Sequence, residues 1–233
     1  MNDSSSSIPS RRQALKRAVL LGGAVGVATP SAPAGPVTPS QTEGPFYPDA
    51  DNDLTFVRSR DQRAQGDLIY VHGVVRDTEG KPVARALVEI WQTDHQGIYN
   101  HAGDANYERK DPNFQSYGRC VTGEDGHYAF KTIKPKAYGD DRFMRTPHIH
   151  FKIWRRGYVD LTTQMYFTGE ELNAQDGIYS RLSEDEQKLV TVSLAPFGEV
   201  EEPLRAQLAA AFEEKSPADS LRAGAFDITL EAV

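Results

Sequence analysis

The pattern His148-Ile149-His150 is the first feature of the chain that could carry chemistry. It lies in a stretch of strand-forming residues, and successive side chains of a strand point to opposite faces, so both imidazoles face the same way. Two neutral nitrogen donors on one face can bind one metal ion. The same pattern is common in polar surfaces and hydrogen-bonded cores, so the residues around it decide its meaning.

Tyrosine supplies the second kind of donor. Tyr138 ends the segment Lys134-Pro135-Lys136-Ala137-Tyr138, ten residues before His148, and a phenol on such a loop can reach over a site beside the strand. A loop tyrosine taken alone is usually a packing residue. The single cysteine, Cys120, excludes an intrachain disulfide framework and a multi-cysteine metal site, so a metal must be held mainly by N and O atoms.

A series of short motifs, in a fixed order along the chain, resembles the intradiol ring-cleavage dioxygenases. These motifs are Glu89-Ile90-Trp91-Gln92, Gly97-Ile98-Tyr99-Asn100-His101, Asp111-Pro112-Asn113-Phe114, Gly118-Arg119-Cys120, Lys134-Pro135, Arg145-Thr146-Pro147-His148-Ile149-His150-Phe151 and Thr163-Gln164-Met165-Tyr166-Phe167. The resemblance extends from about Thr38 to the C-terminus. Within the family, it is strongest to the iron-bearing subunit of the protocatechuate-cleaving branch.

The resemblance implies a set of four iron ligands, which are Tyr99, Tyr138, His148 and His150. The Gly-x-Tyr-x-His context selects Tyr99 over the nearby Tyr107 and Tyr117, which remain fallback candidates. Two phenolates and two neutral imidazoles favour a hard, highly charged ion, and Fe(III) fits best. Such an ion would hold both tyrosines as phenolates, although a free phenol titrates near ~10. His150 stands where a 2-His-1-carboxylate iron(II) oxygenase needs Asp or Glu, which argues against that class.

The implied reaction opens a catechol ring with O2 between its two hydroxyl-bearing carbons and gives a cis,cis-muconate. In it Tyr138 is displaced by the substrate and acts as a base. Arg145 stabilises carbanion-like charge on the attacked carbon, and Gln164 lies near the ring and assists Arg145. The ordinary alternatives are a surface ion pair for Arg145 and a solvated strand residue for Gln164. The Gly139-to-Met144 loop lacks the tryptophan that lines the ring pocket in protocatechuate-cleaving members, so the identity of the substituted catechol stays open.

The elements that position these residues are mainly strands. Strand-forming runs separated by polar, Gly/Pro-containing connections occur at 68–75, 86–91, 127–133, 148–154, 161–167 and 226–231. The first two, on either side of Asp77-Thr78-Glu79-Gly80, are expected to form a hairpin-like pair. Helix signals are limited to a capping box at Ser183 and Glu186 and to apolar spacing over Pro203–Lys215. The chain is therefore predicted to be mainly β, an antiparallel β-sandwich core with a few peripheral short helices and an extended N-terminal arm.

Three parts are expected along the chain: an export signal at 1–34, an extended arm at 35–66 and the sandwich domain at 67–233. Ser10-Arg11-Arg12 resembles a twin-arginine signal, and the apolar run from Ala18 to Ala28 is much shorter than the ~20 residues of a membrane span, so no stable anchor is expected. A periplasmic or secreted enzyme is predicted. The alternative is a cytoplasmic protein with a disordered basic tail.

Composition narrows the classes of partner. The 233 residues are 39% hydrophobic and carry a net charge of -7, and no basic cluster lies outside the N-terminus, so nucleic acid is not an expected partner. A catechol-type small molecule and O2 are the expected partners, and an oligomer or a second, iron-free subunit remains open. Two rival hypotheses are a non-catalytic prealbumin-like β-sandwich binding module, suggested by His72-Gly73-Val74-Val75, and a zinc- or copper-binding sandwich that uses the histidines alone.

Overall fold

Strands dominate the computed structural model, which describes residues 36–41, 51–57, 59–140, 143–214 and 218–233. The predicted export signal lies outside these residues, as does the part of the arm around Gly44-Pro45. The strands are β1 Leu68–Asp77, β2 Leu87–Trp91, β3 Tyr117–Val121, β4 His127–Ile133, β5 Tyr138–Asp140, β6 Phe143–Arg145, β7 His148–Trp154, β8 Leu161–Phe167, β9 Thr191–Val192, β10 Ala195–Pro196, β11 Arg222–Ala225 and β12 Ile228–Leu230. The prediction of a mainly β protein is confirmed.

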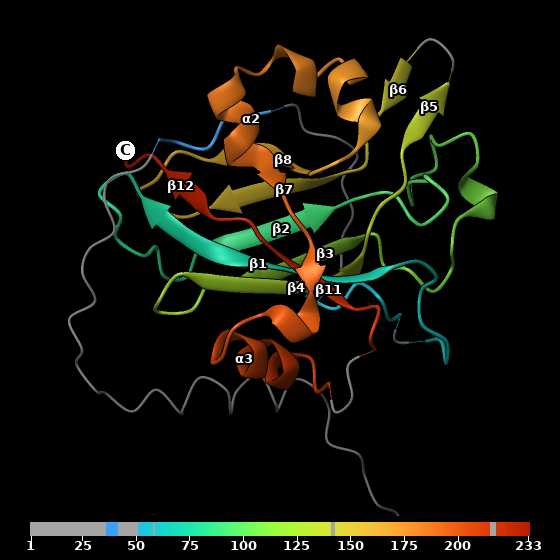
Figure 1. Ribbon diagram of the computed structural model, residues 1–233, viewed down its shortest axis with the longest axis horizontal. Helices are drawn as coiled ribbons and strands as arrows, with labels where there is room; N and C mark the ends of the chain where they lie inside the picture. Colours follow the sequence, from blue (N-terminus) through green and yellow to red (C-terminus); the bar gives the residue numbers. More distant parts are fainter. Residues whose placement is uncertain (1–35, 42–50, 58, 141–142, 215–217) are drawn as a thin grey trace, which may run out of the picture. The chain divides into compact units, whose positions relative to one another are not determined.

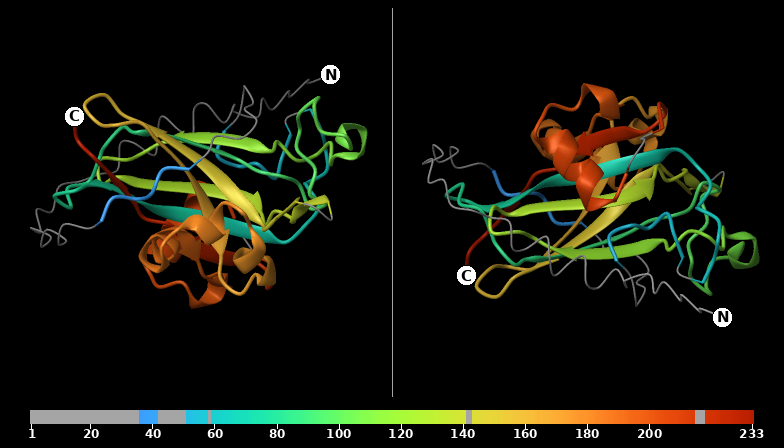
Figure 2. Two further views of the ribbon diagram at one scale, coloured as in Figure 1. Left: turned by 90° about the horizontal axis from the view of Figure 1, so that it is seen from above. Right: turned by 90° about the horizontal axis from the view of Figure 1, so that it is seen from below.

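Two five-stranded sheets form the core (Figures 1 and 2). One has the order β10-β11-β1-β12, with β4 also paired to β1, and the other has the order β3-β2-β7-β8-β9. The long strands pair antiparallel, whereas β11 and β12 join β1 in parallel and β9 joins β8 in parallel. Parallel neighbours need long connections. Accordingly, β11 and β12, which pair with β1, come last in the chain.

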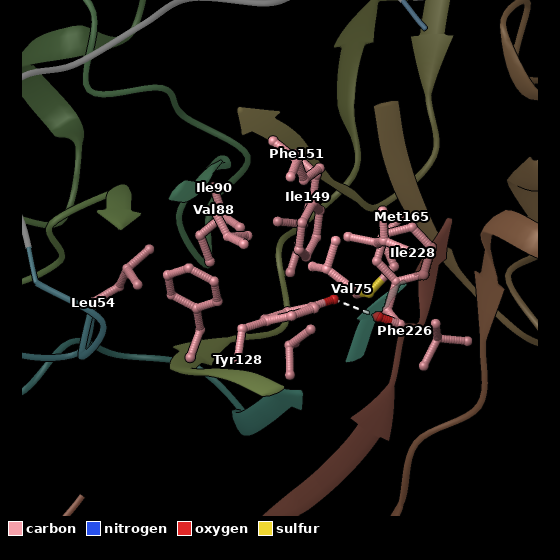
Figure 3. Close-up of a cluster of buried hydrophobic side chains, with 14 of the residues drawn as sticks. Leu54, Val75, Val88, Ile90, Tyr128, Ile149, Phe151, Met165, Phe226 and Ile228 are labelled. Atoms are coloured by element: carbon pink, nitrogen blue, oxygen red, sulfur yellow. Dashed lines mark hydrogen bonds between the residues drawn. The ribbon is translucent and has the colours of Figure 1, made fainter. Parts of the chain in front are cut away.

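The core lies between the sheets because strand side chains alternate between two faces. On β7, Ile149, Phe151 and Ile153 are buried among apolar side chains of both sheets. Figure 3 shows this cluster, where the Tyr128 hydroxyl donates to the carbonyl of Phe226. The even-numbered residues of β7 consequently point to the opposite, outer face of the sheet.

Short helices cover the outer faces. α3 (Leu204–Ala211) packs Leu208 beside Tyr70, on the outer face of β1. α2 (Glu184–Val190) begins with the predicted capping box, because Ser183 and Glu186 exchange hydrogen bonds. Among the described residues, 3₁₀ turns occur at η1 Tyr107–Arg109, η2 Glu171–Gln175, η3 Tyr179–Arg181 and η4 Phe197–Glu199. No helix in the described ranges has the length and apolar character required to cross a membrane.

The predicted hairpin of the first two strands is wrong. The turn itself forms, with Val83 N–H donating to the Val75 carbonyl at 2.8 Å. The chain then passes through Arg85, whose φ is 59°, and enters the other sheet, where β2 pairs with β3 and β7. An isolated pair of apolar runs cannot reveal this, because the local pattern is the same whether the second strand pairs with the first or faces it across a sandwich.

The described parts of the arm lie against the strands. The backbone N–H of Gln41 donates to the Thr162 carbonyl on β8 at 2.6 Å, and that of Leu54 donates to the Lys131 carbonyl on β4 at 2.8 Å. Leu54 is fully buried in the central core. The arm therefore contributes both hydrogen bonds and apolar contacts to the sandwich.

Candidate metal centre

The outer face of the β2-β7-β8 sheet gathers the polar residues of the site. His148 and His150 project from β7 on this face, opposite Tyr166 and Gln164 of β8. His150 also lies opposite Trp91 of β2, and the two rings stack with centroids 4.9 Å apart and an interplanar angle of 2°. The period of two that buries Ile149 in the core places both imidazoles in one cluster, as the sequence predicts.

The two imidazoles face each other through their Nε2 atoms, which are 3.2 Å apart. Nδ1 of His148 lies 2.6 Å from the Thr146 carbonyl, an acceptor, so this nitrogen carries the proton and Nε2 carries the lone pair. Nδ1 of His150 is buried without a hydrogen-bond partner among the described residues. Either tautomer of His150 leaves Nδ1 unsatisfied, while its Nε2 faces both Nε2 of His148 and the Tyr99 hydroxyl.

Electrostatics keep both rings neutral. Burial, and after it the charge of Arg145, lower the pKa of His148 to about 3. Burial, then the neighbouring His148 and Arg145, hold the pKa of His150 well below its ordinary value. Neutral imidazoles are the form that binds metals.

Two loops bring phenols to the histidine pair. The Tyr99 hydroxyl lies 3.1 Å from Nε2 of His150, and the rings of Tyr99 and Tyr138 meet edge to face with centroids 5.2 Å apart. The ring of Tyr138 is 5.7 Å from that of His148. Gly97 permits this approach, because its φ is +83° and a Cβ there would lie 2.6 Å from the Ala137 carbonyl. The two loops can therefore pack backbone to backbone only with glycine at this position.

This donor set fits a ferric ion. Two nitrogen ligands ~2.1 Å from one ion and at right angles to each other lie about 3 Å apart, close to the 3.2 Å between the two Nε2 atoms. No group of three or more His, Cys, Asp or Glu side chains that could hold a metal occurs in the described part of the chain. A metal here would need the tyrosines, and two phenolates with two imidazoles suit a hard, highly charged cation.

Arg145 and Gln164 adjoin the four donors. Arg145 is the cross-strand neighbour of Tyr138 in the β5–β6 hairpin, and its Nη2 donates to Oε1 of Gln164. The hydroxyl of Tyr166 also points to this oxygen, at 3.1 Å, and to Oε1 of Gln41, at 2.8 Å. The structure thus brings every predicted site residue into one cluster, and it adds Tyr166 and the arm residue Gln41 to the cluster.

Asp176 is a site neighbour that the sequence did not indicate. It is fully buried, and its Oδ2 accepts Nε–H of Arg145 at 2.8 Å. Burial alone lowers the pKa of Arg145, but the hydrogen bond and charge of Asp176 outweigh it and hold the pKa above its ordinary value. Arg145 is accordingly a buried, permanently charged group, which contradicts the alternative of a surface ion pair.

The fallback tyrosines have other contacts. The hydroxyl of Tyr117 donates to Glu89 on the neighbouring strand, and Tyr107 carries the Lys110 ammonium 3.7 Å above the centre of its ring. Neither contact involves the histidine pair. The Tyr99 hydroxyl, by contrast, lies in hydrogen-bond range of His150.

Comparison with known proteins places this chain in a family. Residues 42–232 match the family model described as Dioxygenase. The protocatechuate 3,4-dioxygenase beta chain of Burkholderia cepacia is 40% identical over 148 residues, which are 62% of this chain and 61% of that relative. The catechol 1,2-dioxygenase of Candida albicans is 33% identical over 125 residues, 48% of this chain and 40% of that one. The chain thus spans less than two thirds of the length of these relatives.

Solved structures agree with the match. The dioxygenase domain of a dioxygenase carbohydrate-binding protein fusion from Streptomyces sp. SirexAA-E is 28% identical and superposes with a TM-score of 0.59. The superposition covers 85% of this chain and 100% of that one. The catechol 1,2-dioxygenase of Pseudomonas arvilla C-1 is 27% identical and superposes with a TM-score of 0.61. This superposition covers 84% of the present chain and 62% of the other. The match of the family model over most of the chain, joined to these relatives, shows that the chain belongs to the intradiol ring-cleavage dioxygenase family.

Proposed function

We propose that this chain binds Fe(III) through Tyr99, Tyr138, His148 and His150 and uses O2 to open a catechol ring between its hydroxyl-bearing carbons. The product is a cis,cis-muconate-type dicarboxylic acid, which contains all atoms of the substrate and both oxygen atoms of O2. The observation that carries the proposal is that the Tyr99 hydroxyl and Nε2 of His148 lie 3.1 and 3.2 Å from the same atom, Nε2 of His150. The protonated Nδ1 of His148 leaves its Nε2 available as a ligand.

Fe(III) held by Tyr99, Tyr138, His148 and His150 would supply Lewis-acid activation of the bound catecholate toward O2. In this step the chain must supply a group that accepts a proton from the catechol and that can change its position. Tyr138 is half-buried, whereas Tyr99, His148 and His150 are buried. We infer that Tyr138 is the ligand that leaves when substrate binds and that its phenolate oxygen takes one catechol proton.

Arg145 is proposed to stabilise negative charge that develops on the ring carbon. Its guanidinium is buried and fixed between Asp176 and Gln164, so its charge does not need to reorganise during the reaction. Gln164 is proposed to lie against the ring and to hold the Nη2 end of Arg145. A rotating surface arginine would supply much less stabilisation, because water would screen its charge.

The substrate is proposed to be a catechol-type aromatic. The relatives are named for protocatechuate, catechol and hydroxyquinol, and all three compounds carry adjacent ring hydroxyls. Phe143 of the β5–β6 hairpin, two residues before Arg145, is 54% exposed. An exposed aromatic side chain at the start of β6 is suited to contact the ring substituent that distinguishes one catechol from another.

The test is to purify the protein, measure its metal content and record its visible spectrum. Catechol, protocatechuate and hydroxyquinol are then added without oxygen, and ring-opened acid is assayed after O2 is admitted. One iron per chain, a tyrosinate-to-iron(III) absorption band and oxygen-dependent muconate formation are expected. A colourless, metal-free protein would instead indicate the prealbumin-like binding module, and zinc or copper in place of iron would indicate the histidine-only site.

Location and assembly follow as further proposals. We propose export to the periplasm or beyond through the twin-arginine signal around Arg11 and Arg12. Because the relative from Burkholderia cepacia is named as a beta chain, we also propose that this chain associates with itself or with a second subunit. Light scattering after size exclusion, on protein purified from its native host, would test the assembly, and a monomer would contradict it.

A further inference from the structure

Asp176 lies between η2 and η3 and is fully buried. Its side chain has four close partners. Oδ2 accepts Nε–H of Arg145 at 2.8 Å and the backbone N–H of Thr146 at 3.0 Å. Oδ1 accepts the backbone N–H groups of Ile178 at 2.9 Å and Tyr179 at 3.0 Å. A buried carboxylate is thus fully satisfied from within the chain.

All four partners are donors, so the position requires a group that accepts on both sides. A carboxylate does this, whereas the amide of asparagine would turn an NH2 group toward two N–H donors in either orientation. In one orientation of the amide, the N–H groups of Arg145 and Thr146 would lose their acceptor. In the other orientation, those of Ile178 and Tyr179 would lose it. This side chain is therefore specified by charge and by hydrogen-bond direction as well as by size.

Two of the donors lead directly to the site. The guanidinium of Arg145, held by Asp176 at Nε, reaches Gln164 with Nη2. The peptide of Thr146, held at its N–H, belongs to the residue whose carbonyl accepts Nδ1–H of His148 at 2.6 Å. One carboxylate therefore anchors both the charge-stabilising arginine and the residue that orients a metal ligand.

We propose that Asp176 is a positioning residue that sets the orientation of Arg145 toward the reacting ring. The inference rests on the proposed function, because Arg145 needs a reaction in which to act. Asp176 does not contact substrate. Its carboxylate works by fixing Nε, which leaves the Nη2 end of the guanidinium directed along the outer face of β8 toward Gln164.

The experiment is a double-mutant cycle with Asp176→Asn and Arg145→Ala, measured as kcat for catechol cleavage. Asp176→Asn alone is expected to lower kcat about 10- to 100-fold, the usual effect of removing a group that orients a site residue. Iron content and anaerobic catechol affinity should change little, because the four proposed ligands remain. In the Arg145→Ala background, Asp176→Asn should cause no further loss of kcat, since its target is already absent.

A second readout separates positioning from general destabilisation. Arg145→Ala leaves the Asp176 charge buried without its ionic partner, so adding Asp176→Asn should raise the Tm of that variant while its kcat stays the same. The matched control is Asp185→Asn on α2, whose side chain is 92% exposed, and it should resemble the wild type. If Asp176→Asn does not fold, Asp176→Glu keeps the charge but shifts it by one methylene, and it should show the same loss of kcat.

Three outcomes overturn the proposal. The first is a full multiplicative loss of kcat in the double variant, and the second is an unchanged kcat in Asp176→Asn. The third is loss of iron from Asp176→Asn, Asp176→Glu and the double variant alike, which would assign Asp176 to the fold alone. A wild-type protein that does not cleave any catechol would instead contradict the proposed function, so the two failures are distinguishable.

Discussion

His148 and His150 present their Nε2 atoms to each other 3.2 Å apart on the outer face of β7. The carbonyl of Thr146 fixes the proton of His148 on Nδ1, so the lone pair of its Nε2 points into the cluster. Both Nε2 atoms therefore lie close enough together to bind one ion. A shared metal ion at this place would accept one lone pair from each imidazole.

The first prediction concerns the ligands and the colour of the iron form. His148→Ala and His150→Ala should lose iron, because each removes a nitrogen donor. Tyr99→Phe and Tyr138→Phe should each shift or weaken the visible band, because that band requires phenolate bound to iron. The measurements are metal analysis and absorption spectra of each variant. Tyr107→Phe is the matched control and should keep its colour; loss of the band in Tyr107→Phe but not in Tyr99→Phe would reverse the assignment.

The second prediction concerns Arg145. Arg145→Ala should keep iron and colour and still bind catechol without oxygen, while turnover falls about 10² to 10³-fold, the usual cost of removing one fixed charge stabiliser. Anaerobic titration followed by admission of O2 and detection of muconate measures binding and chemistry separately. Near-normal turnover would refute the role, and a parallel fall in iron content and Tm would point to a structural role.

The third prediction concerns the pH dependence of stability in the metal-free protein. Burial lowers the folded-state pKa of His148 to about 3 and holds that of His150 lower than usual, whereas both titrate near ~6.5 when unfolded. Between these values the unfolded chain binds more protons, so the free energy of unfolding should decrease as pH falls from about 6.5 toward about 3. Urea midpoints across this range measure it.

The control for this pH dependence is the variant with both His148→Gln and His150→Gln. Because glutamine does not titrate, the slope of stability against pH should become smaller over the same window. An unchanged slope would show that other groups control the acid sensitivity of the protein.

The fourth prediction concerns the N-terminal arm. Leu54 is fully buried in the core between the sheets, so Leu54→Ala should lower the free energy of unfolding by about 2–5 kcal/mol. Chemical denaturation of the iron-loaded protein measures the change. Arg60→Ala, at an exposed position of the same arm, is the control and should have little effect. Equal stability of the two variants would mean that the arm is not part of the cooperative fold.

The fifth prediction concerns export. Replacing both Arg11 and Arg12 by lysine keeps the charge of the N-terminus but removes the twin-arginine pair. We expect the variant to remain in the cytoplasm, folded and iron-loaded, while the unmodified chain accumulates outside it. Fractionation of cells that express each form, followed by metal analysis, is the measurement. Unchanged accumulation outside the cytoplasm would remove the argument for this route.

The sequence by itself determined the features that follow from local periodicity. The ranges predicted for β4, β7 and β8 agree with the structure at both ends, and the shared orientation of His148 and His150 follows from the period of two in a strand. The capping box at Ser183 is equally local. The motif resemblance added the two tyrosines and Arg145, which no periodicity could have linked to the histidines.

Only the tertiary structure decided which distant groups meet. It placed β1 and β2 in different sheets, although their turn looks like a hairpin. It also paired Arg145 with Asp176, 31 residues later in the chain, and brought Gln41 of the arm to Tyr166 on β8. The physical reason is that side-chain alternation is set by each strand alone, whereas strand pairing and buried ion pairs depend on how all elements pack together. A buried carboxylate and an exposed one look the same in the sequence; they differ in the N–H donors that the fold brings to them.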